Sequence, residues 1–142
     1  MINVVWFKRD LRIHDNEALV KASKSGQVLP LYIYEPLLWR QEEMNCRQHA
    51  FLKVCLKELN SSLLKLGMGL VIKNGNAIEI LNDLNERYGI NEIYSHQETW
   101  NSWTFKRDIE VRKWLKSRNI SWTEVIQNGV IRGIKDRNGW AK

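Results

Sequence analysis

The sequence predicts an α/β protein with a doubly wound, five-stranded parallel sheet and helices on both of its faces. Two observations lead to this prediction: short apolar runs alternate with amphipathic segments from end to end, and glycines close several of the amphipathic segments. A third is size, because 142 residues suffice for one domain with one hydrophobic core. A hydrophobic fraction of 44% and a charged fraction of 27% are ordinary for a globular domain.

The first strand is predicted at VVWF (4–7), where a compact apolar run ends in the charged stretch KRDLR. The following helix is expected to begin with Asp15 as its cap and to continue to about Lys24. VLPLYIY (28–34) has the composition of a second strand. Pro30 lacks a backbone N–H, so it belongs near the start of that strand or at a sheet edge.

The middle of the chain continues the alternation. A loop, EPLLWRQEEMN (35–45), leads into a long helix that runs to Leu66 with apolar residues at helical spacing. GLVIK (69–73) is the predicted third strand. NGN (74–76) then opens a helix that Gly89 closes, since glycine is common just after a helix end.

The last two strands complete the pattern. EIYS (92–95) is the fourth strand, SHQETWNSW (95–103) a loop, 103–118 a helix and SWTEVI (121–126) a shorter fifth strand. Neighbouring parallel strands require crossover helices, and crossovers of this kind are right-handed. The expected architecture is therefore a Rossmann-like, doubly wound sheet.

Ligands of such sheets bind beyond the carboxyl ends of the strands, so binding residues are expected in loops 7–15, 35–46, 74–76 and 96–103. The first of these loops contains no glycine. A dinucleotide-binding turn needs glycines so that the backbone can approach a pyrophosphate, and a Walker loop is also absent. An ordinary NAD or ATP site is therefore not predicted.

The residue types of common catalytic and metal sites are present but scattered. His14, His49 and His96 fall in separate segments, and no serine occupies a strand-to-helix elbow. Cys46 and Cys55 are nine positions apart in one predicted helix, so they point to opposite sides and cannot pair. We predict no catalytic residues and no metal site.

Charge and hydropathy bear on location and partners. The net charge is +6, with basic residues gathered in 104–118 and in the last part of the chain. Such clusters are typical of contact with nucleic acid, phosphates or acidic surfaces, and equally of solvated helix faces and tails. No apolar run is long enough to cross a bilayer, and the amino terminus lacks the plan of a secretory signal. A soluble cytoplasmic protein without membrane contact is expected.

The chain is rich in tryptophan, with seven in 142 residues. Trp6, in the first strand, is predicted to lie in the core. Trp100 and Trp103 fall in the loop after the fourth strand, where an indole either stacks on a planar ligand or packs in the core. The residues alone leave these two interpretations open.

The opening stretch VVWFKRDLRIHDNEAL resembles the amino-terminal signature of the photolyase/cryptochrome family, in which a strand leads into RDLR and then a DN-capped helix. The resemblance continues through VLPLYIYEP, RQHAFLKVCLKELNSSLLKLG and NEIYSHQETWNSWTFKRDIEVRKWL. The tail GVIRGIKDRNGWAK is similar to the linker of bacterial photolyase-like proteins. The resemblance thus runs from residue 2 to the end.

This resemblance implies an α/β antenna domain over 1–127, followed at 128–142 by the start of a linker to a helical FAD-binding domain. The parent would be a deoxyribodipyrimidine photolyase, which repairs UV-induced pyrimidine dimers in DNA with light and reduced FAD. FAD would belong to the helical domain, and damaged DNA would be met through the parent only. The alternatives are the same domain of a cryptochrome photoreceptor, or a stand-alone flavin- or nucleotide-binding module.

The resemblance also indicates residues for an antenna pigment. Arg9 and Asp10 would lie at the carboxyl edge of the sheet, where they face the antenna, anchor the second domain or brace their own loop as ion pairs. Glu98 matches an acidic residue that accepts a hydrogen bond from a deazaflavin ring. Arg47 or Gln48, at the start of the long helix, would assist.

Two further residues bear on which pigment is bound. Asn101 stands where folate-binding relatives carry an acidic residue, which argues against a reduced folate. Trp100 stands where bacterial relatives are expected to have glycine, and its indole would fill the pocket itself. The expected antenna is therefore a deazaflavin, FMN or a reduced folate, or no pigment at all.

Overall fold

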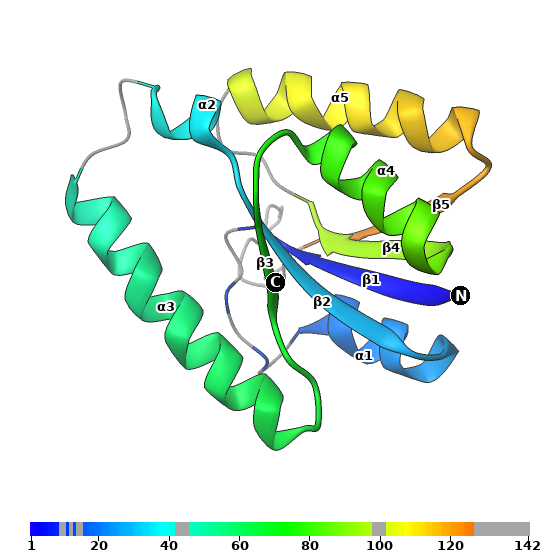
Figure 1. The fold of residues 1–142 in the computed structure, drawn as a ribbon, viewed down its shortest axis with the longest axis horizontal. Helices are drawn as coiled ribbons and strands as arrows, with labels where there is room; N and C mark the ends of the chain where they lie inside the picture. Colours follow the sequence, from blue (N-terminus) through cyan, green and yellow to red (C-terminus); the bar gives the residue numbers. More distant parts are fainter. Residues whose placement is uncertain (9–10, 12, 14–15, 42–45, 98–101, 127–142) are drawn as a thin grey trace, which may run out of the picture.

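The computed structural model describes residues 1–8, 11, 13, 16–41, 46–97 and 102–126. All five strands are parallel and follow the order β3-β2-β1-β4-β5, so β1 lies at the centre of the sheet (Figure 1). This confirms the predicted doubly wound α/β sheet. The strands are β1 (Ile2–Phe7), β2 (Val28–Tyr34), β3 (Val71–Asn74), β4 (Ile90–His96) and β5 (Ser121–Val125).

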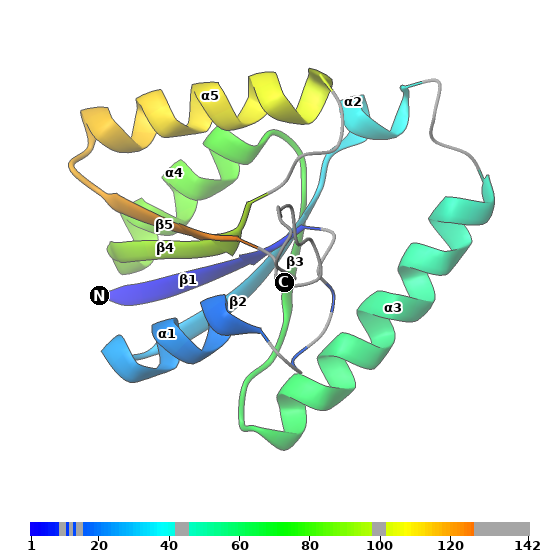
Figure 2. The ribbon, with the colours of Figure 1, turned by 180° about the vertical axis from the view of Figure 1, so that it is seen from behind.

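Helices cover both faces of the sheet, as predicted. In Figure 1, α4 and α5 lie above the sheet, while α1 lies below it and α3 runs diagonally at the side of β3; Figure 2 shows the same arrangement from behind. A short helix, α2, follows β2. The helices are α1 (Glu17–Ser25), α2 (Pro36–Trp39), α3 (Cys46–Lys65), α4 (Ala77–Tyr88) and α5 (Ser102–Ser117).

Each strand sends alternate side chains to the two faces, and this alternation divides the core into two layers. Val4 and Trp6 of β1 belong to the layer under α4 and α5, where they are packed with Leu81 and Leu115. The intervening residues of β1 and the buried residues of α1 and α3 belong to the second layer, together with Tyr32, Tyr94 and Val125 of the other strands. The second layer contains Val5, Phe7, Ala18, Leu19, Ala22, Leu52, Leu59 and Leu63. Trp6 is only 1% exposed, which confirms its predicted place in the core.

The N-cap of the first helix differs from the prediction. Asn16 occupies the cap, and its Oδ1 accepts a hydrogen bond from the Leu19 N–H at 2.9 Å. Asp15, the predicted cap, lies outside the described residues. The sequence HDNEAL offers two adjacent capping residues, and their identity alone does not decide between them.

Two further differences from the predicted boundaries have a local explanation. The predicted loop 35–45 contains α2, because Pro36 at the first helical position has the φ that a helix requires. The third strand begins at Val71, two residues later than predicted. The reason is that the Leu70 N–H donates to Asn60 Oδ1 of α3 at 3.0 Å.

Pro30 lies in an interior strand, because β2 has β1 on one side and β3 on the other. Of the two predicted positions, a place near the strand start is therefore correct. The paired residues of β2 and β3 begin only after this proline, with Leu31 opposite Val71. The predicted linker, 128–142, lies outside the described residues. Within the described part of the chain, no helix has the length and apolar character needed to cross a membrane.

Candidate functional site

Polar side chains are buried where the strands end at the carboxyl edge of the sheet. Lys8 follows β1 directly, Glu35 follows β2, and His96 ends β4; all three are less than 9% exposed. Arg107 and Asp108 of α5 are buried in the same way. Charged residues are rarely buried unless they are paired, so this edge is the first place to look for a functional site.

Four of these residues form a ladder of alternating charge, Lys8–Asp108–Arg107–Glu35, which we call the ion ladder. Asp108 Oδ1 accepts a hydrogen bond from Lys8 Nζ at 3.2 Å and from Arg107 Nε at 2.9 Å. Arg107 Nη1 donates to Glu35 Oε1 at 2.8 Å. Among these four described residues, two positive and two negative charges balance, which reduces the cost of removing them from water.

Tryptophan rings line the cations of the ion ladder. Lys8 Nζ lies 4.4 Å from the ring centroid of Trp6 and 5.0 Å from that of Trp122. The guanidinium carbon of Arg107 lies 5.0 Å from the Trp6 ring and 5.7 Å from the Trp103 ring. These are distances at which a cation is attracted to an aromatic face. The charge that follows the buried first strand is thus accommodated by ion pairs and aromatic rings together.

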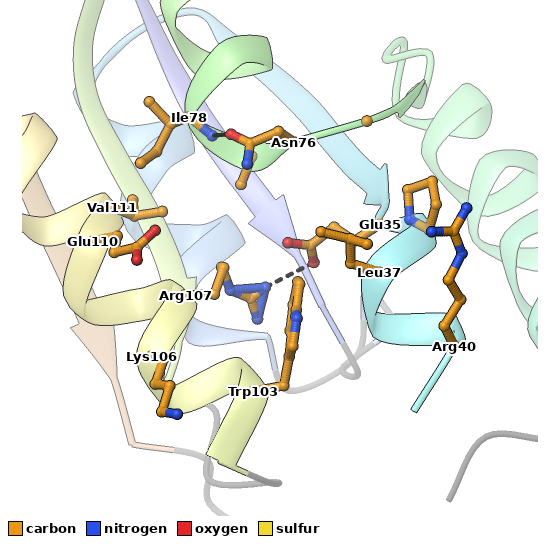
Figure 3. Close-up of a pocket in the computed structure, with 13 residues that line it drawn as sticks. Glu35, Leu37, Arg40, Asn76, Ile78, Trp103, Lys106, Arg107, Glu110 and Val111 are labelled. Carbon is orange, nitrogen blue, oxygen red and sulfur yellow. Dashed lines mark hydrogen bonds and ion pairs between the residues drawn. The ribbon is translucent and has the colours of Figure 1, made fainter. Parts of the chain in front are cut away.

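A cavity of about 420 Å³ opens beside the ion ladder, between α2, the start of α4 and α5 (Figure 3). This volume lies in the range of small-molecule sites. In Figure 3, Trp103 stands beside Arg107, which is joined to Glu35, while Ile78 and Val111 lie farther along the wall. Its charged lining comprises Glu35, Arg40, Lys106, Arg107 and Glu110.

The turn into α4 forms one rim of this cavity. Gly75 has φ +145°, a conformation that favours glycine, and its N–H donates to the Tyr34 carbonyl at 2.9 Å. Asn76 caps α4: its Oδ1 accepts hydrogen bonds from the Ile78 N–H at 2.9 Å and the Glu79 N–H at 3.2 Å. The predicted ligand loops 35–46, 74–76 and 96–103 all contribute residues to the cavity wall.

Most of the predicted antenna residues fall outside the description. Arg9, Asp10, Glu98, Trp100 and Asn101 lie outside the described residues. The other two predicted residues, Arg47 and Gln48, are exposed in the first turn of α3. Neither is among the described residues that line the cavity.

Glu35 and Arg107 were not singled out by the sequence, although a signal for Arg107 was present. The buried residues of α5 recur at Thr104, Arg107, Asp108, Val111 and Leu115, which is the spacing of one helix face. Two adjacent opposite charges within that buried stripe mark a buried pair. Because the same helix contains many other basic residues, this pair did not stand out in the sequence.

The described cysteine and the metal-binding residue types do not add a second site. Burial, together with the nearby Glu58 carboxylate, raises the pKa of the half-buried Cys55 thiol. Such a thiol is a weaker nucleophile near neutral pH, because less of it is ionised. Across the described ranges, no cluster of three or more His, Cys, Asp or Glu is placed to hold a metal ion.

Comparisons of the sequence with known proteins all lead to the same protein family. A sequence model of the DNA photolyase family matches residues 3–133. The chain is 35% identical over 105 residues to the chloroplastic/mitochondrial cryptochrome DASH of Arabidopsis thaliana, covering 69% of this chain and 18% of that protein. It is 35% identical over 122 residues to the deoxyribodipyrimidine photo-lyase of Salmonella typhimurium, covering 81% of this chain and 25% of that protein.

Solved structures match at the level of the fold as well. The cryptochrome of Synechocystis sp. PCC6803 superposes with a TM-score of 0.81 and 26% identity, over 88% of this chain and 27% of that one. A class III photolyase from Agrobacterium tumefaciens superposes with a TM-score of 0.78 and 29% identity, over 88% of this chain and 25% of that one. The match thus spans about a quarter of each solved chain.

Proposed function

Because the chain belongs to the DNA photolyase family and has the fold of that family's N-terminal α/β domain, we propose that it is the light-harvesting antenna domain of a deoxyribodipyrimidine photolyase. In this proposal the parent protein repairs pyrimidine dimers in UV-damaged DNA with light and reduced FAD, held in a helical domain. In the same proposal, catalysis belongs to the helical domain of the parent, and no catalytic role is assigned to this chain. A cytoplasmic location is part of the same proposal.

The cavity at the carboxyl edge is the observation that carries this proposal. Its volume of about 420 Å³ suits a fused-ring ligand, and the half-buried Trp103 offers an aromatic face for stacking. Apolar side chains such as Ile78 and Val111 supply a water-excluding wall, while Arg107 supplies hydrogen-bond donors. A planar pigment with ring carbonyl groups matches this combination of an aromatic face, apolar walls and a buried donor.

A bound antenna pigment would supply light absorption in the near-UV or blue, and the chain would hold it in place. Trp103 would contact the face of the ring system. Arg107, fixed by Glu35 at 2.8 Å, would donate to a ring oxygen or nitrogen. Charge-assisted hydrogen bonds of this kind are stronger than neutral ones and orient their partner, which is what energy transfer to a second pigment requires.

The residues indicated by family resemblance remain part of the proposal. Glu98 would accept a hydrogen bond from a deazaflavin ring, with Arg47 or Gln48 assisting. Asn101 argues against a reduced folate, and Trp100 would compete with any pigment for the same space. Arg9 and Asp10 would either face the pigment or anchor the helical domain.

The test is to incubate the purified chain with FMN, a deazaflavin or a reduced folate, remove unbound pigment by desalting, and record the absorbance spectrum. We expect one pigment to be retained in equimolar amount. Trp103→Ala should weaken its binding about tenfold, equivalent to about 1.4 kcal/mol. Trp114→Ala is the matched control, because Trp114 is half-buried on the same helix but is not among the residues that line the cavity. Failure to retain any of the three pigments would refute the antenna function.

A cryptochrome photoreceptor is the second candidate parent. It is favoured by the 35% identity to the Arabidopsis cryptochrome DASH and by the fit to the Synechocystis cryptochrome. Repair of cyclobutane dimers by the full-length parent under blue light would support the photolyase; binding of FAD without repair would support the cryptochrome. A stand-alone flavin-binding module would retain a flavin and have no helical partner domain.

A further inference from the structure

The ion ladder extends beyond the cavity that it borders. Glu35 and Arg107 line the cavity, whereas Lys8 and Asp108 are not among its described lining residues. We propose that Lys8 and Asp108 are positioning residues, which fix the Arg107 guanidinium in the cavity wall in the orientation that a bound pigment needs. This inference rests on the proposed antenna function for its ligand. The positioning of Arg107 by Lys8 and Asp108 can nevertheless be tested without any ligand.

Two carboxylates hold the guanidinium at two different atoms. Asp108 accepts from Arg107 Nε at 2.9 Å, and Glu35 accepts from Arg107 Nη1 at 2.8 Å. The guanidinium is planar, so two anchored nitrogens fix both its position and its plane. The rings of Trp6 and Trp103, at 5.0 Å and 5.7 Å from its central carbon, restrict it further.

Lys8 competes with Arg107 for the Asp108 carboxylate, since both donate a hydrogen bond to it. Its Nζ lies 3.2 Å from Asp108 Oδ1, and the lysine and aspartate side chains are only 3% and 9% exposed. Without this ammonium group, the buried carboxylate would have Arg107 as its only cationic partner in the ladder. Arg107 would then be drawn toward Asp108 and away from Glu35, because buried charges interact strongly over short distances.

Lys8 cannot easily leave this position. The rings of Trp6 and Trp122, at 4.4 Å and 5.0 Å from Nζ, attract the cation and enclose it. Trp122 is itself held, because its Nε1–H donates to Ser95 Oγ at 2.8 Å. The ladder therefore connects the ends of two strands and one helix with the cavity wall by contacts that are all buried.

The experiment compares Asp108→Asn, Lys8→Met and the double variant, with Asp83→Asn as the control. Asp83 pairs with Arg87 on the exposed surface of α4, so its change removes an ion pair without affecting the cavity. For each variant we would measure the affinity for FMN, the absorbance maximum of bound FMN and the urea midpoint. The Nε–H resonance of Arg107, identified by its loss in Arg107→Lys, would be recorded by ¹⁵N NMR without ligand.

We expect Asp108→Asn to weaken FMN binding at least tenfold, shift its absorbance maximum and move the Nε–H resonance. Lys8→Met should also move the resonance, because Asp108 then pairs with Arg107 alone. The double variant separates positioning from stability. It removes one charge of each sign, so the urea midpoint should recover above that of Asp108→Asn, while FMN affinity should stay low.

Recovery of FMN affinity in step with the urea midpoint would mean that the two residues act only on stability, and would overturn the inference. An Nε–H resonance that is unchanged in Asp108→Asn would overturn it as well. If the wild-type chain retains no FMN while this resonance moves as expected, the flavin ligand is wrong and the positioning of Arg107 stands. The two proposals therefore fail in distinguishable ways.

Discussion

At the scale of single residues, the charged stretch after β1 has a structural explanation. Lys8, the first residue of KRDLR, is 8% exposed and neutralises Asp108 from the far end of the chain. Its placement depends on an anionic partner and on two aromatic rings, since an unpaired buried ammonium would be costly. The same reasoning applies to Glu35, whose carboxylate faces Arg107 at the cavity.

Glu35→Gln tests that pair directly. The substitution keeps the shape of the side chain but removes one of the two carboxylates that pair with Arg107 among the described residues. We expect the free energy of unfolding to fall by about 3 kcal/mol, measured by urea denaturation, because breaking a buried pair leaves charge uncompensated. Glu79→Gln, at an exposed position of α4, should change it by less than about 0.5 kcal/mol. An equal loss of unfolding free energy in the two variants would show that the buried pair stabilises the fold no more than an exposed glutamate does.

Cys55 provides a second residue-level prediction. Burial and the Glu58 carboxylate raise its pKa, so a smaller fraction of the thiol is ionised at about pH 8 than for a free cysteine. In a Cys46→Ser variant, which leaves one thiol, the reaction with a disulfide reagent should be slower than that of a cysteine peptide. Its rate should still rise above about pH 10, where a peptide thiol with a pKa of about 8.5 is almost fully ionised and its rate has levelled off. A reaction faster than that of the peptide would contradict the raised pKa.

At the scale of elements, the start of α4 shows how a local sequence shapes the cavity. Gly75 allows the turn, and Asn76 receives two backbone N–H groups that would otherwise be unpaired. The opposite wall comes from α5, whose buried stripe includes charged residues. A helix that is basic overall therefore directs part of its charge inward, while Lys106, Lys113 and Lys116 remain exposed.

Asn76→Ala should lower the free energy of unfolding by about 1 kcal/mol, because the first turn of α4 loses its side-chain acceptor. Asn76→Asp retains an acceptor and adds a favourable negative charge at the helix start, so it should be close to wild type. Both values come from urea denaturation monitored by circular dichroism. A loss of stability in the aspartate variant as large as in the alanine variant would argue against the cap.

At the scale of the whole molecule, the strand order brings the ends of β1, β2 and β4 to one edge, where the buried charges and the cavity lie together. Because the four charges of the ion ladder cancel, the net charge of +6 belongs to the rest of the chain. A distributed charge of this kind attracts nucleic acid without reading its sequence.

The chain alone should therefore bind duplex DNA weakly, with a Kd of about 1 μM or higher at physiological salt. The affinity should fall steeply from about 50 mM to about 200 mM salt, measured by fluorescence anisotropy, because binding releases counterions. Lys113→Glu together with Lys116→Glu should reduce both the affinity and the salt slope, whereas Lys21→Glu together with Lys24→Glu, two exposed positions of α1, is the control with the same net charge. Tight binding that is insensitive to salt would indicate a specific DNA site on this domain.

Local sequence patterns were enough to predict the alternation of strands and helices, the parallel sheet and the place of Trp6 in the core. These features depend on local patterns: hydrophobic period, capping residues and glycines act within a few positions of one another. Boundaries were harder to predict where a distant contact decides them, as when Asn60 takes the N–H of Leu70.

The pairing of the buried charged residues could not be predicted in this way, because it depends on contacts between distant segments. Lys8 and Asp108 are 100 positions apart, and Glu35 and Arg107 are 72 apart. No local pattern links such pairs. Their contact follows from the order of the strands in the sheet and from the packing of α5 against the ends of β1 and β2. The cavity beside them has the same origin: its walls come from three separate segments, and it exists only once the sheet and its helices are assembled.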